Sequence, residues 1–249
     1  MKILVLEDAS IPNANSYLFW KVGSRNEYPG ITGISHFFEH MMFNGAEKYG
    51  PKLFDQTMEF NGGANNAYTT KDVTVYTNWF PATAMEVIFD LEGDRISSLS
   101  IDPKIVESER GVVLSERSTG LENSPWRVLS ESVEATAFIE HPYHWSVIGY
   151  EDDMKNWKQQ DLERYFKMYY APNNCVVVVS GAMKLADVKK LAEEAATTKP
   201  FQIQNGMKIT ELPGGPDIIS QPRGMTFASE NGDDRILYWD TSPKTGWKV

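Results

Sequence analysis

The segment from Ile31 to Phe43 is the feature that most restricts how this chain folds. Apolar residues occupy every side of a helix drawn through it, which is typical of a helix buried in a core, and Asn44-Gly45 provides a helix end. At about 100° per residue, His36, Glu39 and His40 project together from this helix. Because buried polar groups need partners, the segment predicts a core helix whose polar cluster binds a divalent cation.

The residue types of this cluster favour zinc. Neutral imidazole nitrogens are common zinc ligands, and a carboxylate beside a zinc-bound water can accept its proton. Catalytic zinc sites usually have three protein ligands, so we expect a third ligand from another element. The same spacing also arises by chance on a core helix, and a structural protein with a metal-free polar network is therefore an alternative interpretation.

The predicted helix from Pro103 to Ser118 offers further carboxylates. The apolar residues of its core-facing arc are Ile105, Val106, Val112 and Val113. Glu109 and Glu116 project into the middle of this arc, where two carboxylates need a cation or strong hydrogen-bond donors. A structural network in which both acids pair with Arg95 or Arg110 is the alternative to a metal site.

His36-Phe37-Phe38-Glu39-His40, followed by Glu109 and Glu116, resembles the signature of the inverzincin metallopeptidases. This is the family of pitrilysin, insulysin and the mitochondrial processing peptidases. Other matching segments are 23–27, 62–63 with Asn66-Ala67, 141–143, 148–149 and 170–174. The resemblance covers residues 1 to about 198. It implies that His36, His40 and Glu116 ligate one zinc ion per chain, that Glu39 is the general base and that Glu109 is an acidic helper behind the site.

The resemblance also implies a substrate and a partner. Asn66 and Ala67 would lie on an edge strand where the substrates of the family pair as an added β-strand. We therefore expect a zinc-dependent endopeptidase that hydrolyses peptides or unfolded segments with a zinc-bound water activated by Glu39. Because the family works with paired homologous domains, a second homologous domain or chain is the expected partner. A non-catalytic or partner-dependent subunit of a heteromeric peptidase is the main alternative.

The rest of the chain predicts an α+β fold, a largely antiparallel sheet with helices packed on it. Strands are expected at 3–8 and 16–22, on either side of a turn at 11–15, at 65–70 and 73–79 as a hairpin, and at 175–180. Further helices are expected at 51–60, 82–98, 125–138, 159–170 and 184–196. Helices and strands mix without a strict βαβ rhythm, which indicates the α+β class.

Residues 1–198 are expected to form the zinc metallopeptidase catalytic domain. From Lys199 onward prolines and glycines interrupt weak apolar stretches, and only Arg235 to Asp240 has the pattern of a strand. Residues 199–249 are therefore predicted to be a linker and the incomplete start of a second homologous domain.

Composition excludes several function classes. The 249 residues include 34 Asp plus Glu against 24 Lys plus Arg, and a net charge of −10 repels nucleic acid and anionic membranes. No apolar run approaches the roughly 18 residues of a membrane span, and no signal peptide is present in the chain as given. We expect a soluble protein, and the sequence leaves its compartment open between cytoplasm and periplasm. Cys175 is predicted to be a buried small hydrophobe, and His141 and His144 to belong to a structural loop.

Overall fold

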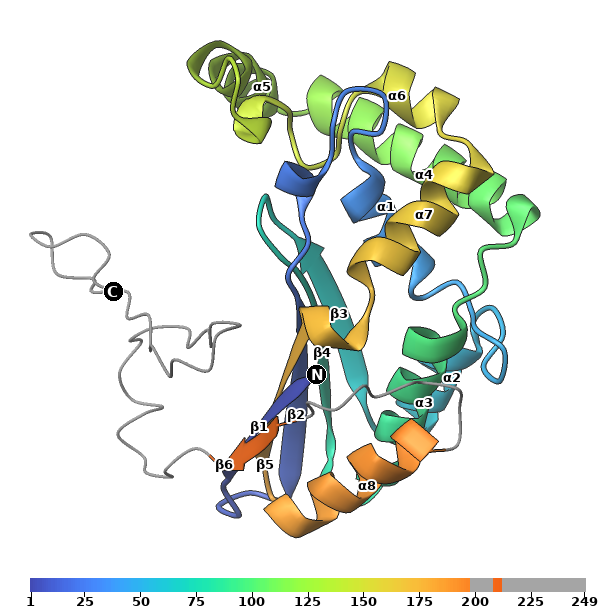
Figure 1. Cartoon of the computed structure of the whole chain (residues 1–249), viewed down its shortest axis with the longest axis vertical. Coiled ribbons are helices and arrows are strands. Elements are labelled where there is room, and N and C mark those ends of the chain that lie inside the picture. The colour runs from blue at the N-terminus through green and yellow to red at the C-terminus, as the bar shows by residue number, and fades with distance from the viewer. Residues whose placement is uncertain (198–207, 212–249) are drawn as a thin grey trace, which may run out of the picture. The chain divides into compact units, whose positions relative to one another are not determined.

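The computed structural model describes residues 1–197 and 208–211, which contain one mixed sheet covered by helices (Figure 1). Its strands are β1 (Lys2–Glu7), β2 (Asn13–Trp20), β3 (Ala64–Thr69), β4 (Thr74–Pro81), β5 (Cys175–Gly181) and β6 (Lys208–Glu211). Their order in space is β3-β4-β2-β5-β1-β6. The β3–β4, β4–β2 and β2–β5 pairs are antiparallel, whereas β1 pairs in parallel with β5 and β6. The predicted α+β fold with a largely antiparallel sheet is confirmed.

The described residues form eight α-helices. They are α1 (Ile34–Met41), α2 (Leu53–Phe60), α3 (Met85–Ser98), α4 (Pro103–Glu122), α5 (Pro125–Ala137), α6 (Glu151–Asn156), α7 (Gln159–Tyr169) and α8 (Leu185–Thr197). Figure 1 shows α1, α2, α3, α7 and α8 on one side of the sheet. No helix in this described part of the chain is long and apolar enough to cross a membrane.

The sheet buries one face against these helices, because buried and partly exposed residues alternate along its strands. In β2, Ala14, Ser16, Leu18 and Trp20 are buried while the intervening residues are partly exposed. On the helix side, Phe37 and Phe38 of α1 are fully buried, and Phe38 stacks on Tyr165 and Phe166 of α7. This packing fixes which side of α1 faces the core and leaves the opposite side for the polar cluster.

Several expectations about the elements need correction. The first two strands flank a turn as predicted, but they are not neighbours in the sheet, because β5 lies between them. The helices α1 and α2 begin later than predicted, α4 continues past Ser118 to Glu122, and the short α6 was not predicted. The predicted strand from Arg235 to Asp240 lies outside the described residues.

Candidate metal centre

The start of α1 is fixed by the backbone around Gly33. This residue has φ 85°, and a Cβ built on it would lie 2.3 Å from the Ile148 carbonyl oxygen, so only glycine fits. The buried Glu27 carboxylate accepts hydrogen bonds from the backbone N–H groups of Gly33 and Ser35, both at 2.8 Å. It thereby caps two free donors at the helix start. Burial raises the pKa of Glu27 to about 8, although these hydrogen bonds oppose the shift.

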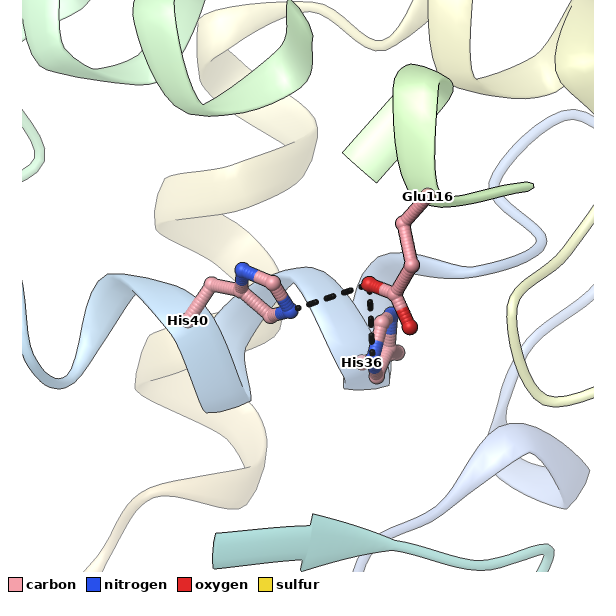
Figure 2. A group of neighbouring side chains, drawn as sticks. All are labelled: His36, His40 and Glu116. Atoms are coloured by element: carbon pink, nitrogen blue, oxygen red, sulfur yellow. Dashed lines mark ion pairs between the residues drawn. The ribbon is translucent and has the colours of Figure 1, made fainter. Parts of the chain in front are cut away.

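The two histidines of α1 meet Glu116 of α4 (Figure 2). Glu116 Oε2 lies 3.8 Å from His36 Nε2 and 3.5 Å from His40 Nε2, and one ligand atom from each residue lies within 4.8 Å of the others. Ligands of a tetrahedral zinc ion at bond lengths of about 2.0–2.2 Å are separated by roughly 3.3–3.5 Å. The two nitrogens and one oxygen therefore fit a zinc ion after small side-chain adjustments.

Glu109 lies behind His40, two helical turns before Glu116. Its Oε1 is 2.7 Å from His40 Nδ1, and its Oε2 accepts a hydrogen bond of 2.8 Å from the Asn44 side chain. A carboxylate on the far nitrogen of a ligating histidine fixes the ring and makes its other nitrogen a better ligand. The hydrogen bond with His40 lowers the pKa of Glu109, so this acid is ionised at neutral pH.

The pKa values of the two histidines are shifted in opposite directions. Burial, with the nearby charge of His40, lowers the pKa of His36 to about 4, so His36 is neutral at pH 7. Burial alone would also lower the pKa of His40, but hydrogen bonds with Glu109 and Glu116 raise it to about 9. Glu109 and Glu116 thus favour a protonated His40, and a cation held by His40 and Glu116 would replace that proton.

Glu39 belongs to the cluster without being part of the ligand set. Its Oε2 accepts a 2.5 Å hydrogen bond from the Thr69 hydroxyl of β3, and burial raises its pKa. The group of possible ligands among the described residues consists of His36, His40 and Glu116 only. Glu39 therefore lies beside this group of possible ligands as a partly buried carboxylate.

The arc predicted for α4 is partly wrong. Val106 and Val113 are buried, but Val112 is 49% exposed, because the buried stripe continues through Arg117 instead. The alternative network of Glu109 and Glu116 with arginines is also wrong. Arg95 pairs with Glu92, and Arg110 pairs with Glu107 and backbone carbonyls.

Glu39 and Ala67 line two cavities next to β3. The larger, of about 520 Å³, includes His36, Thr69 and Glu116, and the smaller, of about 280 Å³, includes His40, Asn66 and Ala67. β3 lies at one edge of the sheet and, among the residues that the structure describes, pairs only with β4. The Ala67 N–H donates to the Asn66 side-chain oxygen at 2.9 Å.

Other residues singled out in the sequence lie apart from this centre. His141 Nδ1 accepts a hydrogen bond from the Tyr143 N–H, and His144 Nδ1 lies 2.9 Å from the Phe138 carbonyl oxygen. Neither histidine joins a possible metal-binding group in residues 1–197 or 208–211. Cys175 is buried, and burial raises the pKa of its thiol, which disfavours a nucleophilic thiolate.

Sequence reasoning missed two supporting side chains. Asn44 lies just beyond the end of α1, where its side chain donates to the His40 carbonyl oxygen and to Glu109. Thr69 follows Ala67 by two residues and so shares its face of β3, but its contact with Glu39 depends on the packing of α1 on the strand.

Comparison with known proteins places these residues in a family context. Residues 2–151 match the family described as Insulinase (Peptidase family M16), and this match includes all of α1 and α4. Residues 156–238 match the family described as Peptidase M16 inactive domain.

Three similar proteins illustrate the match. Zinc protease PqqE of Helicobacter pylori is 34% identical over 177 residues, which cover 71% of this chain and 40% of that protein. Mitochondrial-processing peptidase subunit beta of Blastocladiella emersonii is 30% identical over 171 residues, which cover 69% of this chain and 37% of that protein. The crystal structure of a protease from Helicobacter pylori has a TM-score of 0.76 and 30% identity, over 82% of this chain and 50% of that one. The chain thus spans half or less of the length of these relatives.

Proposed function

The chain belongs to peptidase family M16, and from this premise we propose that it is the catalytic part of a zinc-dependent endopeptidase. The proposed substrates are peptides or unfolded segments. The observation that carries the proposal is the meeting of His36, His40 and Glu116, with Glu39 beside them but outside the ligand set. A structural zinc site would instead close the coordination with a fourth protein ligand.

The proposed cofactor is one zinc ion per chain, held by the two histidines and Glu116. When bound, zinc lowers the pKa of water and polarises a carbonyl group, which favours hydrolysis of an amide. Glu109 and Asn44 hold His40 in the orientation that presents Nε2 to the ion.

Glu39 is the proposed general base. Its burial raises its pKa toward the working range of a catalytic acid and base, so it can accept a proton from water and later donate it to the leaving amine. The Thr69 hydroxyl holds one carboxylate oxygen, which restricts the carboxylate to one orientation.

The proposed peptide site is the edge of β3. An extended peptide that pairs with this edge gains backbone hydrogen bonds and reaches the two cavities that Glu39 and Ala67 line. Asn66 and Ala67 lie at that edge, and the peptide must displace the Asn66 side chain from the Ala67 N–H. The same internal hydrogen bond protects the edge from unwanted pairing in the free protein.

We further propose that residues 1–198 are the catalytic domain and that residues 199–249 are a linker and the start of a second homologous domain. The chain spans 40%, 37% and 50% of the three relatives described above, which supports a second homologous domain or chain as the partner. An open site leaves one side of the peptide unsupported, so full activity is expected only with that partner.

A non-catalytic subunit is the second candidate, and the match of residues 156–238 to an inactive domain favours it. Hydrolysis of a quenched unfolded peptide by zinc-loaded chain separates the two, with and without a homologous partner chain. Cleavage that is lost in Glu39→Gln supports the peptidase. Cleavage that is equal in parent and Glu39→Gln, or absent even with the partner, overturns the proposed function.

A further inference from the structure

The larger cavity beside Glu39 is lined by both cationic and acidic side chains. It extends from the metal ligands His36 and Glu116 to helix α5 and has a volume of about 520 Å³. Its cationic side chains are Lys71, Arg117 and Arg127, and its acids outside the metal cluster are Glu131 and Glu134. How these groups pair decides which charge the cavity offers to a ligand.

Two of the three cations are already paired. Lys71 Nζ lies 2.9 Å from Glu134 and also donates to two backbone carbonyls, at 2.9 and 3.0 Å. Arg117 is buried and donates to both carboxylate oxygens of Glu131, at 2.9 and 2.8 Å. These pairs use both acids, so a cationic ligand would find no free carboxylate outside the metal cluster.

Arg127 is different, because its guanidinium has no hydrogen bond or ion pair within residues 1–197 and 208–211. Arg127 is exposed, and its guanidinium lies against Gly120 of α4. A Cβ built on Gly120 would lie 2.3 Å from Arg127 Nη1, so a larger residue at position 120 would push the guanidinium aside. Gly120 follows Glu116 by one helical turn and shares its face of α4. Arg127 therefore lies against α4 next to the metal position, and its charge helps to lower the pKa of Glu116.

We propose that Arg127 binds a carboxylate of the peptide substrate in this cavity. A planar guanidinium donates two parallel N–H groups to a carboxylate, and this geometry binds the ion more specifically than a lone charge does. The carboxylate comes from an acidic side chain next to the cleaved bond or from the end of the peptide chain. The inference rests on the proposed peptidase function and adds a substrate preference to it.

Matched peptides test the preference. In the first set of pairs, Glu is compared with Gln at one position near the cleaved bond at a time, in peptides with an amidated C-terminus. In the second pair, a peptide with a free C-terminal carboxylate is compared with the same peptide amidated at its C-terminus. The zinc-loaded chain, with its partner if required, should cleave one acidic peptide roughly tenfold more efficiently than its neutral match, as expected for one charge-assisted hydrogen-bonded pair. The first set identifies a side-chain carboxylate and the second pair a chain end.

Two variants remove the contact by different routes. Arg127→Gln removes the charge, and Gly120→Ala displaces the guanidinium while favouring the helix. Both variants should reduce the ratio of cleavage efficiencies between the acidic peptide and its neutral match toward one. Arg164→Gln, on an exposed residue of α7 outside the cavity, is the matched control and should keep it. Added salt should weaken the preference of the parent, because the pair is partly exposed.

Binding to the zinc-loaded Glu39→Gln protein separates this inference from the proposed function. Fluorescence anisotropy of labelled peptides should show the same roughly tenfold preference without turnover. If no peptide is cleaved but the preference appears in binding, the peptidase proposal fails and the role of Arg127 stands. Equal affinities of acidic and neutral peptides, or a preference that survives both Arg127→Gln and Gly120→Ala, overturn the inference.

Discussion

Replacing Glu109 by Gln isolates the contribution of the carboxylate behind the metal position. The side chain keeps its size and can still accept a hydrogen bond from His40, but it loses its charge. In the parent, Glu109 Oε1 is 2.7 Å from His40 Nδ1, and the carboxyl side chain is only 15% exposed. Water therefore screens the interaction little, and the variant removes a partly buried charge that raises the basicity of a ligand.

We expect Glu109→Gln to bind zinc about 10- to 100-fold more weakly than the parent, which corresponds to roughly 1.4–2.8 kcal/mol. Competition with a chromophoric chelator measures this difference in dissociation constant. The titration is best run at pH 8, because the proton that Glu109 helps to hold on His40 competes with the ion more strongly at lower pH.

Glu107→Gln is the matched control for this experiment. Glu107 lies on the same helix, its side chain is 76% exposed, and it pairs with Arg110. This variant loses the same charge and should leave zinc affinity within about twofold of the parent, since an exposed charge contributes little. Equal affinities of Glu109→Gln and the parent, or equal losses in both variants, would refute the positioning role of Glu109.

Three further predictions concern the base, the packing and the helix cap. Thr69→Val removes a hydrogen bond that lowers the pKa of Glu39, so the acid limb of the pH profile of kcat/KM should move to higher pH. The value of kcat should also fall roughly tenfold, because the carboxylate loses a contact that orients it. An unchanged profile would show that Thr69 does not orient the base. In urea titrations, replacing the buried Val113 by Ala should lower the free energy of unfolding by about 2 kcal/mol, whereas replacing the exposed Val112 by Ala should change it by less than about 0.5 kcal/mol. Similar losses in both variants would contradict the assignment of Val113 to the buried face of α4. Burial raises the folded-state pKa of Glu27 from 4.5 to about 8, so the folded state binds more protons between these values and this contribution to stability is lost as pH rises from about 4.5 through 8. Glu27→Gln should flatten that decline in thermal unfolding scans, and an equally steep decline in the variant would assign it to other groups.

The side-by-side arrangement of His36, Glu39 and His40 was predictable because helical spacing determines the direction of each side chain. His36, Glu39 and His40 share a face of any helix drawn through this segment, and the apolar neighbours require that helix to be buried. The distance between His40 and Glu116 was not predictable from spacing, because it depends on how α1 packs on α4. The two carboxylates on the core-facing arc of the Pro103 helix predicted that this helix supplies the third ligand, and the family resemblance singled out Glu116.

The errors have physical causes as well. The apolar pattern of α4 predicts Val112 inside, but the structure buries Arg117, whose guanidinium binds Glu131, and leaves Val112 exposed. Helix α6 escaped prediction because it is only 6 residues long and buries only Met154. The insertion of β5 between β1 and β2 is a long-range pairing that no local pattern records.

The zinc content of the purified chain tests the central claim most directly. Elemental analysis after exposure to zinc and removal of the excess should find about one ion per chain in the parent and in Glu39→Gln, because Glu39 lies outside the ligand set. His40→Ala should retain far less, since it leaves two ligands. Circular dichroism of each variant confirms that the fold is kept. Equal zinc in the parent and His40→Ala would contradict the account, and loss of zinc in Glu39→Gln would make Glu39 a ligand instead of the base.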